Sequence, residues 1–315
     1  MIRLYDFDEV KPEEILNRDI RAEADVEATV DAIIADVRAR GDAALLDYAA
    51  KFDHAQLTSV QVTQAEIDEA FSELEASDPE FITTLKMAAS NIRHFHEQQL
   101  HKNFVLNDRP GMVLGQKYTP IQRAGVYVPG GTAAYPSTVL MDVIPAKVAG
   151  VQQIVMTTPA GKDGKVNAGI LAAAVIAGID CIFKTGGAQA VAALAYGTES
   201  VPAVDKIVGP GNIFVATAKK LLYGVVDIDM IAGPSEVLVM ADETADPKFV
   251  AADLMSQAEH DVLASAILVT TCPELAEKVQ AEINRQASYL SRKEIIEKSM
   301  NEYGAFLLCD TVSYT

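Results

Sequence analysis

The sequence predicts an α/β fold built on a parallel sheet. Beyond Pro120, short β-rich runs alternate with Ala-rich runs of helical length, which is the pattern of βαβ units. That alternation favours strands buried between two layers of helices. The N-terminal third has apolar residues at helical spacing instead, and it is predicted to be mostly helical.

The helical segments come first along the chain. Residues 25–52 and 78–99 have the spacing of long helices, and Asp78 followed by Pro79 suits an N-cap and a first helical position. Later helical runs end in glycines at the position where a positive φ is needed, and these are Gly150, Gly178, Gly197 and Gly224.

The strands follow in two series. The first series is predicted at 123–129, 151–159, 179–187 and 204–211. The second is predicted at 236–242, 265–271 and 305–310, so the residues from about 237 onward form a further α/β layer. Only six residues follow the run Ala305 to Cys309, although such a strand normally leads to a covering helix. We therefore expect the domain to continue past the end of this sequence.

Composition excludes several classes of function. The 315 residues hold 26 Lys and Arg against 44 Asp and Glu, a net charge of −18, which argues against nucleic acid or an anionic membrane as the partner. The longest uncharged apolar stretch, 168–179, is too short to span a bilayer, and the start MIRLYDFDEV lacks the pattern of an export signal. A small-molecule enzyme fits this composition better.

The cysteines are few and widely spaced. Cys181, Cys272 and Cys309 are expected to be reduced thiols, which predicts a cytoplasmic protein. An aldehyde dehydrogenase with a cysteine nucleophile would need a reactive thiol at the exit of a strand. Cys181 and Cys309 fall inside strand-like runs and Cys272 precedes Pro273 at a helix start, so that class is disfavoured.

Three glycine turns are the first candidates for chemistry. They are 126–131, 185–189 and 208–212, each at a strand exit, where helix N-termini offer N–H groups to phosphate oxygens. Tyr127, Gln189 and Asn212 then lie near one sheet edge, as an aromatic surface and two amides suited to a dinucleotide. No full GxGxxG motif follows a strand, so spacing alone leaves a nucleotide site and plain tight turns both open.

The segment SQAEHD is the second candidate. Gln257 and His260 are three residues apart and share one face of a helix, so both could reach one metal ion. A zinc centre takes three or four ligands, and the other histidines all precede residue 102. Ser235, at another strand-edge turn, is by its position either a turn residue or a ligand. Glu259 is a poor candidate for a base because adjacent helix residues diverge.

Five stretches in register closely resemble the histidinol dehydrogenase family: RAGVYVPGG, GGAQAVAALAYGT, VGPGN, AGPSEVLV and SQAEHD. The resemblance implies that a zinc-bound amino alcohol, L-histidinol, is oxidised by two NAD through histidinaldehyde to L-histidine, the last step of histidine biosynthesis. It implies that Tyr127, Gln189 and Asn212 contact NAD. It also implies that Ser235 contacts histidinol, and that Gln257 and His260 bind both zinc and substrate.

The resemblance also implies an architecture. It consists of two related, incomplete Rossmann-like domains of the aldehyde-dehydrogenase-like kind, with the second inserted in the first behind an N-terminal helical segment. Residues 127–236 are expected to form the insert, flanked by 1–126 and 237–315. The family is homodimeric, which is the assembly the resemblance implies.

The sequence departs from this family at its end. Family members continue past Thr315 through a Pro-Glu-His segment that holds the catalytic acid/base pair, and then supply an Asp and a later His to the zinc. We therefore expect a C-terminally truncated enzyme with negligible turnover. The alternative is a catalytically silent nucleotide-binding module on the same scaffold.

Overall fold

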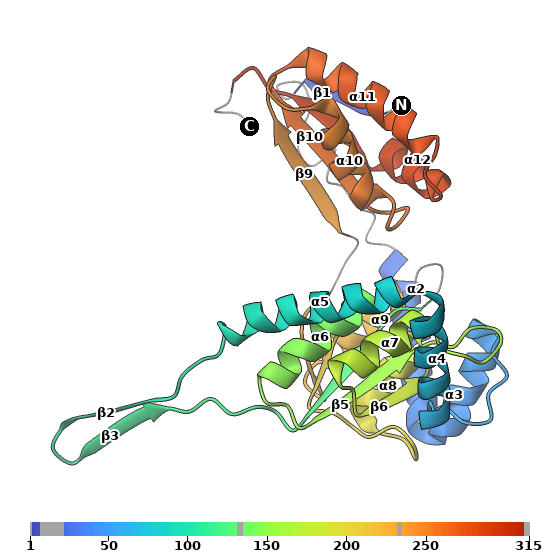
Figure 1. Cartoon of the computed structure of the whole chain (residues 1–315), viewed down its shortest axis with the longest axis vertical. Coiled ribbons are helices and arrows are strands. Elements are labelled where there is room, and N and C mark those ends of the chain that lie inside the picture. Colours follow the sequence, from blue (N-terminus) through green and yellow to red (C-terminus); the bar gives the residue numbers. More distant parts are fainter. Residues whose placement is uncertain (1, 7–21, 131–134, 232–234, 312–315) are drawn as a thin grey trace. The chain divides into compact units, whose positions relative to one another are not determined.

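The computed structural model describes residues 2–6, 22–130, 135–231 and 235–311. It separates into two compact units. One is Ala22–Ala232, and the other combines Met1–Arg21 with Gly233–Thr315. The first contains a five-stranded parallel sheet and the second a four-stranded parallel sheet (Figure 1). The predicted α/β fold with parallel sheets is confirmed.

The five-stranded sheet has a doubly wound topology. Its strands are β4 (Arg123–Tyr127), β5 (Gln153–Thr158), β6 (Cys181–Lys184), β7 (Lys206–Val208) and β8 (Asp227–Ile228). They lie in the order β6-β5-β4-β7-β8, which is 3-2-1-4-5 when numbered along the chain. In such a sheet the winding reverses between the first and fourth strands, and a crevice opens there at their carboxyl ends. Here that point lies between β4 and β7.

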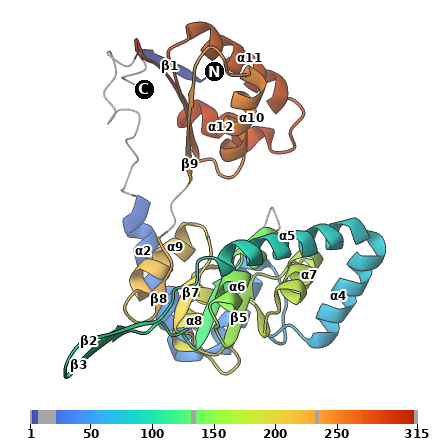
Figure 2. The ribbon, with the colours of Figure 1, turned by 60° about the vertical axis from the view of Figure 1, so that its left-hand side comes forward.

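Helices cover both faces of this sheet (Figure 2). One face carries α6 (Pro136–Val148) and α7 (Ala168–Ala177), with α4 (Gln64–Ser77) and α5 (Pro79–Glu97) packed outside them. The other carries α8 (Gly187–Tyr196) and α9 (Ile213–Leu222), with α2 (Ala22–Arg40) and α3 (Asp42–Tyr48) outside. Each layer encloses its own hydrophobic cluster, so the strands between them are almost fully buried.

The predicted helix signals are found in place. The Asp78 carboxylate accepts a hydrogen bond from the backbone N–H of Phe81 at 3.0 Å, and Pro79 is the first residue of α5. The four glycines predicted to follow helices all have positive φ. These residues supply the backbone conformation and the caps that helix ends require.

The N-terminal helical run is interrupted, contrary to the single helix predicted over 25–52. Gly41, with φ 54°, separates α2 from α3, and the last turn before His54 is a π-helix, η1 (Ala49–Asp53). A Cβ on Gly41 would stand 2.1 Å from a carboxylate oxygen of Glu199. The same Glu199 carboxylate accepts the backbone N–H of Asp42 at 2.8 Å, so the break joins the helices to the loop after α8.

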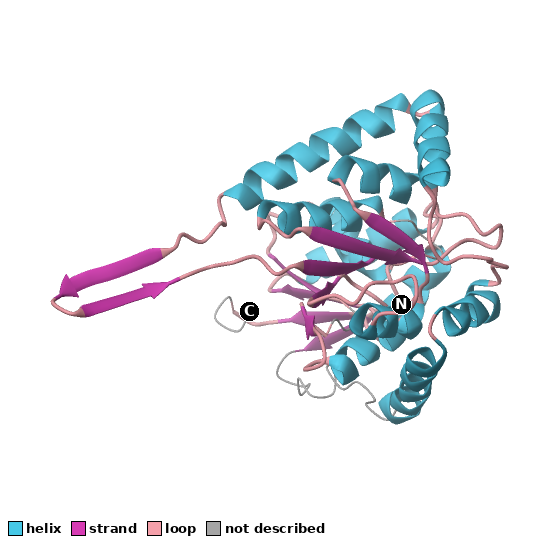
Figure 3. Cartoon of the chain, turned by 90° about the horizontal axis from the view of Figure 1, so that it is seen from below, coloured by secondary structure: helices cyan, strands magenta, loops and turns pink. Residues whose placement is uncertain are grey.

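A β-hairpin follows α5 and was not predicted. Its strands, β2 (Phe104–Arg109) and β3 (Met112–Gln116), pair antiparallel around Gly111, and the hairpin projects from the Ala22–Ala232 unit (Figure 3). Both strands are exposed along nearly their whole length. Among the described residues of the N-terminal third, the segment 22–97 is mostly helical, as predicted.

The second sheet contains the three predicted strands and one more. β9 (Glu236–Ala241), β10 (Ser265–Thr270) and β11 (Ala305–Leu308) lie side by side, and β1 (Arg3–Asp6) adds to β11 at the edge. One face packs on α10 (Pro247–Ala258), α11 (Pro273–Ala287) and α12 (Lys293–Glu302). No local pattern predicted this N-terminal strand, because it forms by pairing with residues at the other end of the chain.

The compact units group residues 22–126 with 127–232, whereas the resemblance implies a discontinuous domain of 1–126 with 237–315 and an insert at 127–236. The helices of residues 22–97 pack on the faces of the five-stranded sheet and so belong to its unit. At the other end the units separate between 232 and 233, close to the expected limit. The domain limits implied by the resemblance stay a prediction.

Candidate functional site

A cavity of about 390 Å³ lies at the carboxyl edge of the five-stranded sheet. Tyr127, Gln189 and Asn212 all line it, together with glycines at the strand exits. Each residue comes from a different strand exit, after β4, β6 and β7, so the doubly wound order brings them together. The predicted convergence of these three side chains at one sheet edge is therefore observed.

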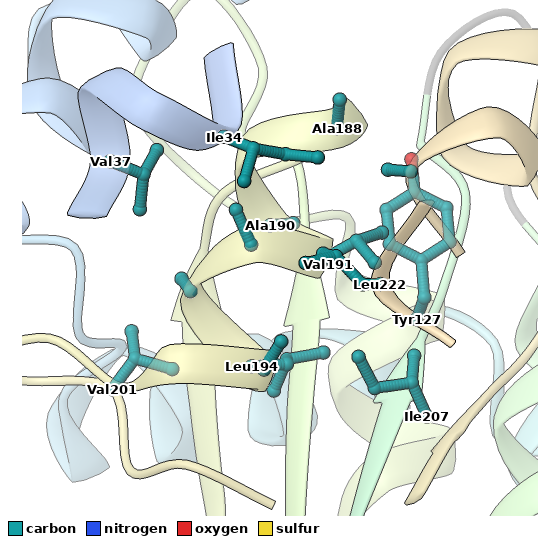
Figure 4. Packing of buried hydrophobic residues seen from close by; sticks show 14 of the residues in the cluster. Ile34, Val37, Tyr127, Ala188, Ala190, Val191, Leu194, Val201, Ile207 and Leu222 are labelled. Carbon is teal, nitrogen blue, oxygen red and sulfur yellow. The ribbon is translucent and has the colours of Figure 1, made fainter. Parts of the chain in front are cut away.

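Tyr127 ends β4 and is only 4% exposed. Its ring belongs to the hydrophobic cluster that includes Val191, Ile207 and Leu222 (Figure 4). Its hydroxyl accepts a hydrogen bond from the backbone N–H of Gly187 at 3.2 Å. Burial raises the pKa of Tyr127 to about 12, so the phenol stays protonated at neutral pH and keeps a proton to donate.

Gln189 is 2% exposed in the first turn of α8, where its amide faces the cavity from a buried position. The two preceding glycines make room for the close approach. Gly187 has φ 63°, and a Cβ there would stand 2.7 Å from Oε1 of Gln189. A Cβ on Gly186 would stand 2.8 Å from Cβ of Pro159. This turn therefore requires glycines because side chains would collide with the lining of the cavity.

Asn212 is the N-cap of α9. Its side-chain oxygen accepts the backbone N–H groups of Phe214 at 3.1 Å and Val215 at 3.2 Å. The amide nitrogen then remains as the donor group of this side chain. Asn212 thus has a structural role that its position in a glycine turn did not reveal, besides its place in the cavity lining.

The turn before Asn212 is fixed by a buried ion pair. Lys219, 1% exposed, pairs with Asp229 and donates to the carbonyl oxygen of Gly209 at 3.0 Å. The Asp229 carboxylate also accepts the backbone N–H of Gly209 at 2.9 Å. Gly209 has φ 116°, and a Cβ there would stand 2.1 Å from the carbonyl oxygen of Tyr127. The ion pair holds the exits of β4 and β7 in close contact.

A second cavity of about 670 Å³ adjoins the first along the same edge. It is lined by the loop between β5 and α7, and it shares Phe52, Asp53, Gly130 and Pro159 with the first cavity. Neither Phe52 nor Asp53 was identified from the sequence. Both belong to η1, and only the packing of the N-terminal helices against the sheet brings them to this edge.

The other predicted site residues lie in the second unit. Ser235 is exposed immediately before β9, and its carbonyl oxygen accepts the N–H of Ser265 at 3.4 Å. Gln257 is half-buried in the last turn of α10, and His260 lies two residues past its end. The His260 backbone N–H donates to the Gln257 carbonyl at 3.2 Å, which continues the helical turn. The convergence of these residues with the first cavity stays a prediction.

An amide oxygen and an imidazole nitrogen suit zinc chemically, but they supply two of the three or four ligands it usually takes. Within the four described segments, no cluster of three or more His, Cys, Asp or Glu side chains is placed to hold a metal ion. His94 and His96 lie on α5, where His96 is engaged with Gln99 at 2.6 Å.

The cysteines have the surroundings of structural residues and not those of a catalytic nucleophile. Cys181 and Cys272 are free thiols, and burial raises the pKa of Cys181 to about 11, which makes it a poor nucleophile at neutral pH. Cys272 occupies the N-cap position of α11 before Pro273, at the helix start that was predicted. Among the helices that the structure describes, each is too short or too polar to cross a bilayer.

Comparison with known proteins gives a consistent result. Residues 16–315 match the family model for histidinol dehydrogenase. The histidinol dehydrogenase of Clostridium acetobutylicum is 54% identical over 290 residues, covering 92% of this chain and 67% of that protein. That of Bacillus subtilis is 53% identical, covering 90% and 66%.

A solved histidinol dehydrogenase structure from Elizabethkingia anophelis superposes with a TM-score of 0.91 at 38% identity, covering 99% of this chain and 72% of that one. The chain spans about two thirds of the length of these relatives.

Proposed function

This chain belongs to the histidinol dehydrogenase family, an oxidoreductase family of histidine biosynthesis, and on that premise we propose that its carboxyl-edge cavity binds NAD. The observation that carries the proposal is the meeting of Tyr127, Gln189 and Asn212 in one cavity at the topological switch point. Open α/β sheets bind their ligands at this point. The N-terminal ends of α8 and α9 also border it, which favours a pyrophosphate.

The three side chains can hold a dinucleotide by donating hydrogen bonds to it and by van der Waals contact with it. The Tyr127 phenol stays protonated and can donate a hydrogen bond to the ligand. The Gln189 and Asn212 amides supply further hydrogen-bond donors from fixed positions. Rigid placement matters because hydride transfer needs the nicotinamide carbon within contact distance of the reacting carbon. In the first proposed oxidation, the carbinol carbon of histidinol gives a hydride to one NAD and its hydroxyl releases a proton, which yields the aldehyde. Water adds to the aldehyde, and the hydrated carbon gives a second hydride to another NAD with release of two further protons, which yields the carboxylate.

We assign substrate and metal contacts to the second unit. Ser235 would contact histidinol, and Gln257 and His260 would bind both substrate and zinc. When bound, zinc would hold the amino alcohol in place and polarise its oxygen. The metal would need further ligands, which the family resemblance assigns to residues beyond Thr315, as it does the acid/base pair. The homodimer and the cytoplasmic location remain predictions.

The binding part of this proposal can be tested with NADH alone. The sequence contains no Trp, so ligand fluorescence can be followed against a low protein background. We expect saturable NADH binding to residues 1–315, and Gln189→Leu should weaken it because the buried amide would be replaced by an apolar group of similar size. Absence of saturable binding by the wild-type chain would overturn the proposal.

The catalytic part needs a second experiment. The polypeptide of residues 1–315, given NAD, histidinol and zinc, is expected to form negligible NADH. A chimera that continues with the last third of the Clostridium acetobutylicum relative should oxidise histidinol. A chimera that binds NADH and folds, yet leaves histidinol unchanged, would favour the silent nucleotide-binding module.

A further inference from the structure

We propose that a third cavity of the Ala22–Ala232 unit binds a small organic ammonium ion. This cavity has a volume of about 440 Å³ and lies between α6, β7 and residues 119–121. In this arrangement the ammonium donates a hydrogen bond to the Asp142 carboxylate, and the apolar body of the ligand packs against the rest of the lining. The described lining shares no residue with that of the 390 Å³ cavity, so the inference goes beyond the proposed NAD site and does not depend on it.

The cavity follows from the way helices cover the five-stranded sheet. α6 and α7 lie on one face, whereas α8 and α9, which follow β6 and β7, lie on the other. β7 lies beside β4, so the space over β7 on the α6 face is bordered by α6. Lys206 and Val208 of β7 line this space, and Val208 packs against the hydrophobic cluster of the α6 layer. The cavity therefore fills a place where the helix layer ends.

Most of the lining is apolar. Met141, Pro145 and Ala146 contribute from α6, and Pro120 and Ile121 contribute from the segment before β4. The volume lies in the range of small-ligand pockets, which typically combine apolar walls with a few polar groups. The apolar walls can contact a hydrocarbon or aromatic body, so the polar groups of the lining decide which head group is bound.

Asp142 brings an unsatisfied oxygen to this lining. Its Oδ2 is buried, and no described residue forms a hydrogen bond to it. The pKa of Asp142 is raised to about 7, chiefly by burial, so its ionised form is disfavoured as long as it has no partner. A buried carboxylate oxygen without a donor is costly, and most such groups in proteins are satisfied by a partner, water or ligand. A ligand with a positively charged donor would satisfy this one.

The lysines beside the cavity are already paired with other carboxylates. Lys206 lines the cavity, but its ammonium pairs with Asp227 at 2.7 Å. The charge of Lys219 acts on Asp142, yet the Lys219 ammonium pairs with Asp229. When Asp142 is ionised, no described cation neutralises it by direct contact. The cavity therefore favours a cationic ligand over a neutral or anionic one.

The backbone of the preceding residue offers a second acceptor. Pro145 lies inside α6 and has no N–H, so the carbonyl of Met141, four residues earlier, lacks its regular helical donor. Met141, Asp142 and Pro145 all line the cavity. An ammonium has three N–H donors, so it can satisfy the carboxylate oxygen and this carbonyl together.

These acceptors suit an ammonium better than a divalent metal ion, since Ca²⁺ and Mg²⁺ take about six oxygen ligands. Asp229 also lines the cavity, but Lys219 occupies its Oδ1. The backbone N–H of Gly209 donates to its Oδ2 at 2.9 Å. Within the described lining, Asp142 is then the carboxylate with an open oxygen, and one such group matches a single positive charge.

The test compares 2-phenylethylamine with 2-phenylethanol, which carry an ammonium or a hydroxyl on the same apolar body. At pH 8 the amine is protonated, and calorimetric titration of residues 1–315 measures the binding of each compound. The wild-type chain should bind the amine about 10-fold more tightly than the alcohol, as expected for a hydrogen bond to a charged group. Asp142→Asn should lose most of this preference, whereas Asp31→Asn, on the exposed face of α2, should keep it.

Ala149→Leu tests the apolar walls independently of charge. Ala149 lines the cavity but is exposed at the end of α6, so the variant should fold, as cooperative thermal unfolding would verify. The larger side chain should narrow the cavity and weaken the amine and the alcohol by the same factor, roughly 5-fold or more.

Three results would overturn the ammonium site. They are a wild-type chain that does not bind the amine or does not prefer it to the alcohol, an unchanged preference in Asp142→Asn, and unchanged amine binding in Ala149→Leu. NADH titration of the same proteins keeps the two proposals apart. Because the two cavities share no described lining residue, Asp142→Asn and Ala149→Leu should bind NADH as the wild type does.

Discussion

The hydroxyl of Tyr127 accepts a hydrogen bond from the backbone N–H of Gly187 at 3.2 Å, which ties the end of β4 to the start of α8. The contact lies at the border of the 390 Å³ cavity and uses a helix-terminal N–H that would otherwise be free. It leaves the phenolic proton available to a ligand. Tyr127 is therefore expected to act both in holding the cavity and in binding.

Tyr127→Phe should reveal both roles. Loss of one neutral hydrogen bond should lower the free energy of unfolding of the Ala22–Ala232 unit by about 1 kcal/mol. Loss of the hydrogen-bond donor should raise the dissociation constant for NADH by about 3- to 10-fold. Urea unfolding and NADH titration measure the two effects. NADH affinity equal to that of the wild type would mean that the phenol does not contact the ligand.

Asn212 offers a way to separate capping from binding. Asn212→Ala removes the cap of α9 and should cost about 1 kcal/mol, whereas Asn212→Asp keeps a capping oxygen and should retain stability within about 0.5 kcal/mol. Both variants lose the amide hydrogen-bond donor, so both should bind NADH more weakly. Asp78→Ala is the matched control, because it removes the N-cap of the outer helix α5 and should lower stability without changing NADH affinity.

Local signals were sufficient to predict strands β4 to β7 and β9 to β11, but not the two-residue strand β8. The cap at Asp78 and the glycines after helices act over a few residues, and the structure confirms them. β1 could not be predicted, because it is fixed by pairing with β11 at the other end of the chain. The exposed hairpin was equally inaccessible, because its strands lack a buried face that would impose an alternating pattern.

The candidate site was predictable where glycine marks a strand exit. Tyr127, Gln189 and Asn212 each neighbour such a turn, and the parallel topology brings the exits together. Phe52 and Asp53 lie in a helical run with no motif, and their approach to the cavity follows from tertiary packing of η1. The grouping of Ser235, Gln257 and His260 with this cavity depends on two separate compact units, so it stays a prediction.

The ion pair between Lys219 and Asp229 should be important for stability. Lys219 is buried, and Lys219→Met would leave a partly buried Asp229 without its cation while removing the hydrogen bond to the Gly209 carbonyl. We expect a loss of about 2–4 kcal/mol in the free energy of unfolding, together with weaker NADH binding as the glycine turn loosens.

Lys206→Met is the control for this change. Lys206 pairs with Asp227 at 2.7 Å, but both side chains are more than a third exposed, so the loss should be much smaller than for Lys219→Met. Equal losses in the two variants would show that burial does not distinguish the two ion pairs. Urea unfolding of the Ala22–Ala232 unit provides the comparison.

Asp142 on α6 should make stability depend on pH. Its pKa is raised to about 7, chiefly by burial and also by the nearby Asp229 carboxylate, against the opposing charge of Lys219. Its pKa is then higher in the folded chain than in the unfolded chain, so between about pH 4 and 7 the folded state binds more protons. The contribution of this carboxyl to stability is therefore present at low pH and is lost as pH rises through 7.

Asp142→Asn removes the charge at nearly constant size. Relative to the wild type, the variant should be more stable by about 1–3 kcal/mol at pH 8, and the difference should vanish near pH 4. Asp31→Asn, on the exposed face of α2, should show no such trend. The raised pKa of Asp53 gives the wild type a pH dependence of the same sign. The quantity to compare across pH is therefore the difference in the free energy of unfolding between the wild type and Asp142→Asn. A constant difference from pH 4 to 8 would contradict a buried, titrating Asp142.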